Sequence, residues 1–186
     1  MPQAAADRSS SWILPFVLAA GFLASGCGVL IGNVKPVEDK SNAYRVADLQ
    51  VLKADWRKLE SSLKEAGAAE DVSDVAFQSK TTSSIISLNS ACRPGGDQRS
   101  LKEISRLLFL GLSQSSAPEE QTLEVERVPA LQTTVEGRLN NEPVRLRTVV
   151  LRKGECVYDL MYVARPEQFD KQLGDFTHFV SSLRIR

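Results

Sequence analysis

The residue types best able to do chemistry in this chain of 186 residues are three cysteines and one histidine. A conventional zinc site takes four ligands, and this set is too small to suggest one. His178 lies two residues from Phe176 and from Val180, about 200° around a predicted helix from either apolar side chain, so we expect it to face solvent. Nucleophile-elbow, zinc-protease and P-loop motifs are absent from the sequence. We therefore predict a protein that is not an enzyme, with no catalytic residue, metal or cofactor.

Cys27 follows a segment that is typical of a secretory signal. Residues 12–32 carry no charge, and the small residues 24–26 separate the apolar centre from the cysteine. Small side chains at this point let the backbone enter a peptidase cleft. Leu23-Ala24-Ser25-Gly26-Cys27 resembles the lipobox of bacterial lipoproteins. In that family the cysteine thiol receives a diacylglyceryl group, the preceding peptide is removed, and the new amine is acylated.

The resemblance implies a lipid anchor at Cys27 and a location in the cell envelope. The alternative is an uncleaved transmembrane anchor, since residues 12–31 are uncharged and a span needs ~20 residues. Pro15 and several glycines weaken such a helix. Gly28 after the cysteine resembles the pattern sorted to the outer membrane, facing the periplasm, in bacteria with two membranes. Both alternatives attach the chain to a membrane from outside the cytoplasm.

Cys92 and Cys156 remain as an even pair if Cys27 is lipidated. Outside the cytoplasm the environment is oxidising, so we predict a disulfide between them. The alternative is two buried free thiols, a common state for cysteine.

Composition and charge place the chain among ordinary globular proteins. The sequence has 23 basic and 23 acidic residues, and 42% of its residues are hydrophobic. A nucleic-acid partner is therefore not expected, and neither is a disordered chain. We predict a signal peptide over 1–26, a lipidated flexible tether over 27–43 and a single globular domain over 44–186.

The domain alternates strand-like and helical patterns. Ser100 and Glu103 form a predicted capping box at the start of one helix, and Pro166 opens the closing helix. Six strands are predicted, over residues 75–79, 84–89, 122–128, 131–139, 144–152 and 156–164. The last is apolar on both faces and needs cover on each side. This indicates an α+β, three-layer sandwich: a mainly antiparallel sheet of about six strands with helices on both faces.

One segment, Asp48–Glu65, has an ambiguous pattern. Its apolar residues recur at helical spacing, and this periodicity predicts a helix. The stripe consists of Leu49, Leu52, Trp56, Leu59 and Leu63.

The order of elements is similar to the PsbP-like fold of photosystem extrinsic proteins and their relatives. The segment Cys156–Phe169, followed by Phe176–Leu183, looks like that family's last strand and closing helix. A group of uncharacterised bacterial lipoproteins is also similar, with Asn89-Ser90-Ala91-Cys92 before the first long helix. The resemblance covers about Trp56 to Leu183. It implies a strand around Trp56, against the periodicity, and a binding or assembly role by analogy.

Arg145 and Arg147 are the candidate contacts for an anion or a partner. They share one face of a predicted strand, where they could pair with a phosphate or a carboxylate. The alternative is that they are exposed edge-strand charges that discourage aggregation.

These observations favour a membrane-anchored envelope lipoprotein that acts as a non-enzymatic partner-binding or assembly module. The alternative is a carrier of an apolar ligand, held between the sheet and a helix by residues such as Tyr158, Tyr162 and Phe169. A large apolar cavity would favour the carrier, and a filled core with an exposed apolar patch would favour the binding module.

Overall fold

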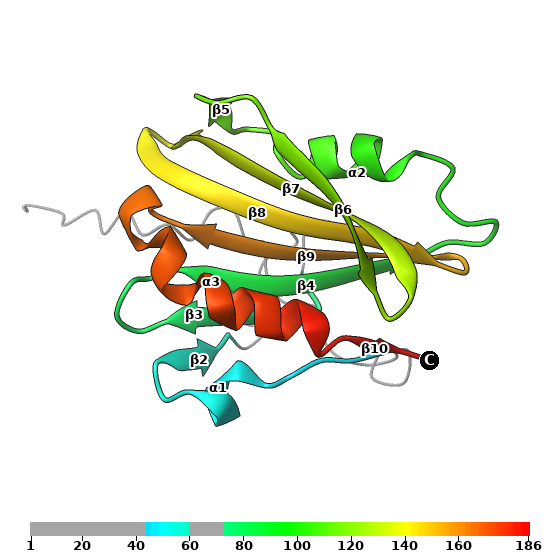
Figure 1. The fold of residues 1–186 in the computed structure, drawn as a ribbon, viewed down its shortest axis with the longest axis horizontal. Helices are drawn as coiled ribbons and strands as arrows, with labels where there is room; N and C mark the ends of the chain where they lie inside the picture. Colours follow the sequence, from blue (N-terminus) through cyan, green and yellow to red (C-terminus); the bar gives the residue numbers. More distant parts are fainter. Residues whose placement is uncertain (1–43, 60–72) are drawn as a thin grey trace, which may run out of the picture.

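An eight-stranded antiparallel sheet forms the centre of the protein in the computed structural model (Figure 1). The structure describes residues 44–59 and 73–186, so the predicted signal peptide, the tether and Cys27 lie outside the described residues. The strands are β2 (Trp56–Lys58), β3 (Val75–Ser79), β4 (Ile85–Cys92), β5 (Ser113–Gln114), β6 (Glu119–Val125), β7 (Val128–Leu139), β8 (Glu142–Lys153) and β9 (Cys156–Ala164). Their order is β2-β3-β4-β9-β8-β7-β5, and β6 also pairs with β7.

Tight turns connect the long strands as hairpins. Glu126 and Arg127 join β6 to β7 with φ of 52° and 64°, and Asn140 and Asn141 join β7 to β8 with φ of 48° and 67°. Two consecutive left-handed residues form the turn type whose twist matches that of the flanking strands. The paired strands therefore follow one another in space as they do in sequence, in agreement with the predicted mainly antiparallel sheet.

Three helices and a second small sheet complete the described structure. The helices are α1 (Leu49–Leu52), α2 (Leu101–Leu107) and α3 (Pro166–Ser181), and β1 (Tyr44–Arg45) pairs with β10 (Arg184–Ile185). The capping box of α2 is present, with Ser100 and Glu103 each accepting a hydrogen bond from the other's backbone N–H. Pro166 occupies the first turn of α3, as predicted.

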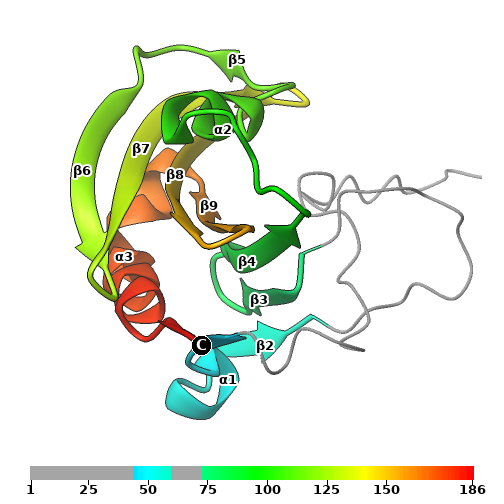
Figure 2. The same ribbon diagram turned by 90° about the vertical axis from the view of Figure 1, so that its right-hand side faces the viewer.

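The two longer helices use opposite faces of the sheet. Val149 and Leu151 of β8 pack in the main core with α3, whereas Val150 between them packs with Ile104 of α2. Alternate residues of a strand point to opposite faces, so β8 is buried on both sides. Figure 2 shows the sheet curving around α3, with α2 on the other side of the sheet. The predicted α+β class with a mainly antiparallel sheet is confirmed.

The predicted helix over Asp48–Glu65 is wrong where the structure describes it. Helix α1 ends at Leu52, and Trp56 begins strand β2, opposite Ser79 of β3. The Trp56 side chain is fully buried. Pairing with β3 and burial of the indole outweigh the weak preference that apolar spacing gives a helix. Residues 60–65 lie outside the described residues.

The predicted disulfide is present. Cys92 and Cys156 lie directly opposite each other in the register of β4 and β9, with Cα atoms 4.0 Å apart, and their sulfur atoms are bonded. The bond joins strands that are distant in sequence and central in the sheet.

Candidate functional site

Helix α3 lies between two very different flanks of the curved sheet. One flank is formed by β2 and the turn between β3 and β4, and the other by β6 and β7. We call them the clamped flank and the open flank. The clamped flank is filled by hydrogen-bonded side chains, and the open flank contains a groove.

A buried amide is the centre of the clamped flank. Gln172 of α3 donates from Nε2 to Asp55 Oδ2 at 2.7 Å and to Ser79 Oγ at 2.9 Å. Its Oε1 accepts from Thr82 Oγ1 at 2.6 Å. The side chain is therefore satisfied at both ends, as a buried polar group must be. These bonds join α3 to two separate loops.

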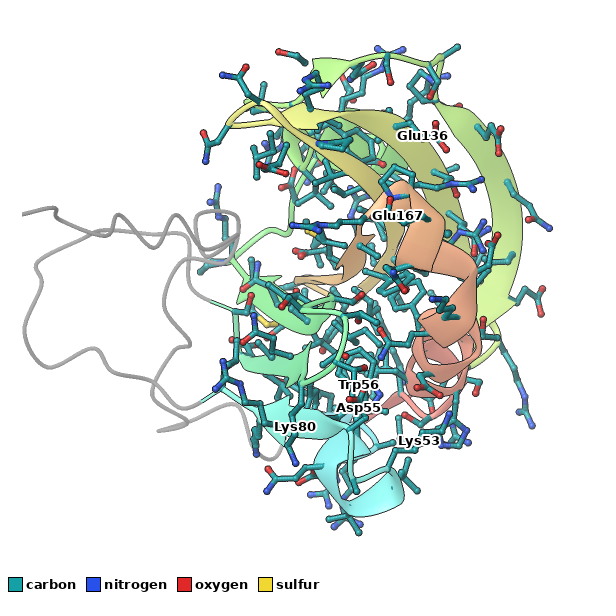
Figure 3. The ribbon with its side chains drawn as sticks, turned by 90° about the vertical axis from the view of Figure 1, so that its left-hand side faces the viewer. Lys53, Asp55, Trp56, Lys80, Glu136 and Glu167 are labelled. Carbon is teal, nitrogen blue, oxygen red and sulfur yellow. A yellow bond between two sulfur atoms is a disulfide. The ribbon has the colours of Figure 1, made fainter. Side chains whose placement is uncertain are left out.

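Trp56 supplies a second contact on the same flank. Its Nε1 donates to Asp175 Oδ2 of α3 at 2.9 Å, and Lys53 forms an ion pair with the same carboxylate. Figure 3 shows Lys53, Asp55 and Trp56 together beside α3. The edge of the sheet and the middle of the helix are thus held together by polar contacts around one aromatic ring.

Asp55 is kept ionised by its neighbours. Burial alone would raise its pKa, but hydrogen bonds from Ser79 and Thr81, with the charge of Lys80, outweigh burial and lower the pKa. A carboxylate that is held in its charged form by several donors suits a structural role more than proton transfer.

The open flank contains a groove between β6 and α3. Its cavity volume is about 320 Å³, at the lower end of the range for small-molecule sites. Leu123 and Val125 of β6 line one side, and Phe176 and Val180 of α3 line the other. Thr177 also borders it. We call this cavity the β6–α3 groove.

Sequence reasoning missed this groove. The strand and the helix that form it were both predicted, but they are separated by about fifty residues of sequence, and only the curvature of the sheet brings them together. An alternating apolar pattern at Leu123 and Val125 was the available signal, and it did not distinguish a groove wall from ordinary core.

Strand β6 is an exposed strand that pairs with β7 among the described residues. Its charged side chains Glu119, Glu120 and Glu124 are exposed. Glu120 accepts from Lys102 of α2 at 2.7 Å. The groove therefore combines four apolar side chains with the polar residues Glu124, Glu126, Gln132, Thr177 and Ser181, beside an acidic strand.

Arg145 and Arg147 both lie on the α3 face of β8. Their guanidinium carbons are 4.7 Å and 5.5 Å from the centre of the Phe169 ring. Arg147 Nε donates to Thr134 Oγ1 at 2.9 Å, and Arg145 Nε is 3.4 Å from Glu136 Oε1. Burial, followed by the charge of Arg145, lowers the pKa of Arg147.

This geometry corrects one of the two interpretations of the arginine pair. Strand β8 lies between β7 and β9, so the arginines are not edge-strand charges. They cover the aromatic ring at the beginning of α3 through cation–π contacts. Their role as contacts for an anion or a partner stays a prediction.

The aromatic residues expected to line a carrier pocket belong to the packed core instead. Tyr158, Tyr162 and Phe169 are each no more than 2% exposed. The rings of Tyr162 and Phe169 are 4.9 Å apart, and the Tyr162 hydroxyl donates to the Phe169 carbonyl at 2.8 Å. Burial raises the pKa of Tyr162 to about 12.

His178 is exposed on α3, as expected. Across residues 44–59 and 73–186, no cluster of three or more histidine, cysteine and acidic side chains could hold a metal ion. In the same part of the chain, no helix combines the length and apolar character that a membrane span requires.

Comparison with solved structures assigns the fold. The cyanobacterial PsbP protein (CyanoP) from Synechocystis matches 88% of this chain and 99% of its own, with a TM-score of 0.54 and 11% sequence identity. The domain has a PsbP-like fold. LpqN of Mycobacterium tuberculosis, described as involved in cell envelope biogenesis, covers 76% of this chain and 82% of its own, with a TM-score of 0.51 and 12% identity.

The PsbP-like domain has no match to a family model, and no curated protein matches its sequence. At 11–12% identity the structural neighbours define only the fold of the domain. Its function has to be inferred from the residues of its own surface.

Proposed function

We propose that this chain is a lipid-anchored envelope protein whose PsbP-like domain binds a protein partner and catalyses no reaction. The β6–α3 groove is the observation that carries the proposal. Its walls combine partly exposed Leu123 and polar side chains with the edges of the buried residues Val125, Phe176 and Val180, next to an exposed acidic strand. Apolar residues with a polar surround are the usual composition of the centre of a protein interface.

The envelope location rests on the lipobox-like sequence before Cys27. It is also compatible with the description of LpqN, a structural neighbour, as a protein of cell envelope biogenesis. Acyl chains contribute ~0.8 kcal/mol per buried methylene, so two or three of them would make retention at the membrane long-lived. Confinement to the membrane raises the effective concentration of the domain near envelope partners, and a weak interface can then be occupied.

The arginine pair extends the proposed binding face. Arg145 and Arg147 lie on the same face of the sheet as α3, and Phe169 beneath them holds their side chains in place. Guanidinium groups held in this way are suited to a carboxylate of the partner.

Two experiments on the intact protein in its membrane test the proposal. Metabolic labelling with a fatty-acid probe should label the wild-type chain and leave Cys27→Ser unlabelled. A photo-crosslinking residue at Thr177, on the groove, should capture a distinct protein. The matched position Arg106, exposed on α2 at the opposite face, should not capture it. Absence of label on the wild-type chain would contradict the lipid anchor. Equal capture at both positions would contradict the groove as the binding site.

A carrier of a small apolar ligand is the second candidate, because the groove has a volume that suits one and apolar side chains on both walls. Lipid that co-purifies with the wild-type chain and is lost when Val180→Glu places a charge in the groove would favour the carrier.

A further inference from the structure

The side of β6 that faces away from β7 has the chemistry of a strand-addition site. We infer that the partner binds as an extended, basic segment that adds a strand to this free side of β6 and places alternate apolar side chains in the β6–α3 groove. The inference rests on the proposed function and gives the partner segment its chemistry: an extended backbone, alternating apolar residues, and lysine or arginine between them.

The register of the hairpin identifies the free backbone groups. Val125 and Val128 face each other across the two-residue turn, and this closing pair exchanges hydrogen bonds in such a hairpin. Hydrogen-bonded and non-bonded pairs then alternate along an antiparallel ladder. The N–H and C=O groups of Glu120, Thr122 and Glu124 therefore point away from β7. Within the part of the chain that the structure describes, no other strand pairs with them.

The groove lies where the side chains of an added strand would go. Leu123 and Val125 point from β6 into the main core, and α3 completes the groove with Phe176 and Val180. In Figure 2, β6 is the outermost strand and curves toward α3. A further strand beside β6 would continue this curve. Every second side chain of that strand would then face the groove, the arrangement by which strand addition gains specificity.

Charge selects a basic partner over a second copy of this chain. Glu119, Glu120 and Glu124 are exposed on β6, and Lys102 pairs with Glu120. Two copies paired along β6 would bring glutamates against glutamates, and like charges opposite each other destabilise a strand pair. Glu120 and Glu124 share the face opposite to Leu123 and Val125. A segment with lysine or arginine on that face would instead place opposite charges across the new strand pair.

Peptide binding to the full-length chain in detergent micelles tests this inference. The probe is a short fluorescent peptide that alternates lysine with valine, and its binding is followed by fluorescence polarisation. We expect saturable binding, weaker by about tenfold or more for a matched glutamate–valine peptide or for the lysine–valine peptide with N-methylated backbone amides. Equal binding of the N-methylated peptide would overturn strand addition, and equal binding of the acidic peptide would overturn the charge assignment.

A pair of substitutions at one residue separates the backbone from the side chain. Thr122→Pro removes an N–H that faces the free side and leaves the ladder to β7 intact, whereas Thr122→Val keeps the N–H. We expect the peptide to bind about tenfold more weakly to Thr122→Pro and unchanged to Thr122→Val. Circular dichroism and thermal unfolding should show both variants folded. Unchanged binding to folded Thr122→Pro would overturn the inference, and so would a dimer of the full chain that Thr122→Pro dissociates.

The outcomes keep this inference separate from the proposed function. Capture of a partner at Thr177, together with a negative result for the peptide and for Thr122→Pro, would leave a partner-binding protein that does not use strand addition. Peptide binding that depends on Thr122, without fatty-acid labelling or capture in the membrane, would leave a strand-addition site and remove the envelope function.

Discussion

The two flanks of α3 differ in how completely the sheet holds the helix. On the clamped flank, the amide of Gln172 and the indole of Trp56 bond to groups of another element, and the Trp56 side chain is fully buried. On the open flank, the same helix faces β6 across a cavity of about 320 Å³. Polar groups that are satisfied by partners on another element indicate a structural contact, and a cavity beside an unpaired strand side indicates a surface that can accept another chain.

Truncation of Trp56 should cause the largest loss of stability. Trp56→Ala removes a fully buried ring and leaves a cavity, which costs about 3–5 kcal/mol of unfolding free energy. Trp56→Phe keeps most of the packing and loses only the bond to Asp175, a cost of about 1 kcal/mol. Denaturant unfolding of the full chain measures both values. A loss below about 1 kcal/mol for Trp56→Ala would contradict the structural role of this flank.

Gln172→Leu should cause the next largest loss of unfolding free energy. The leucine keeps the volume of the side chain but removes the amide donor to Asp55 and Ser79 and one of the hydrogen-bond partners of Thr82, so we expect a loss of about 1–3 kcal/mol. Lys171→Ala, at the exposed neighbouring position, is the matched control and should stay within about 0.5 kcal/mol of the wild type. Equal effects of the two substitutions in denaturant unfolding would show that the network does not hold the helix.

Acid should weaken the clamped flank through Asp55. The pKa of Asp55 is lowered in the folded protein, so the folded state favours the carboxylate more than the unfolded state does. Its contribution is present above the unfolded pKa of about 4 and is lost as the pH falls through the lower folded value. Unfolding free energies measured between pH ~6 and ~3 should fall less steeply for Asp55→Asn than for the wild type. If the unfolding free energies of the wild type and of Asp55→Asn fell equally steeply with pH, the acid sensitivity would come from other carboxylates.

A substitution on the open flank should change the unfolding free energy least. Thr177 is exposed beside the groove, and its hydroxyl bonds only within α3, to the carbonyl of Leu173 at 3.0 Å. Thr177→Ala should therefore change the unfolding free energy by no more than about 0.5 kcal/mol. A loss as large as that of Gln172→Leu would mean that both flanks are structural and would remove the contrast between them.

Elements with strong local signals were predicted well from the sequence. Strand β9 begins at Cys156 and ends at Ala164 as predicted, and α3 opens at Pro166. Proline at a first helical turn and a nine-residue run of apolar and aromatic residues act locally, so no knowledge of the rest of the fold is needed. The Cys92–Cys156 disulfide was predicted from the number of cysteines and the expected compartment. The register of β4 and β9 places the two cysteines directly opposite each other.

Short elements and the site itself were not predictable in the same way. Strands β2 and β5 have three and two residues, too few for a period to appear, and they exist because β3 and β7 offer them partners. The predicted sheet of about six strands is consequently one of eight. The position of β8 inside the sheet, which changes the interpretation of Arg145 and Arg147, also depends on strand order and cannot be read from the pattern of one strand.

From the sequence alone came the long strands, the helices that begin at Ser100 and Pro166, the Cys92–Cys156 pair, and the lipobox-like pattern at Cys27. These features depend on side chains near one another in the sequence or on simple counting. The tertiary structure alone decided that the sheet bends around α3, so that one flank of the helix closes on Trp56 and Gln172 and the other remains open beside β6. Sheet curvature is the sum of many small strand twists, and no local pattern specifies where the two ends of such a curve will meet a helix.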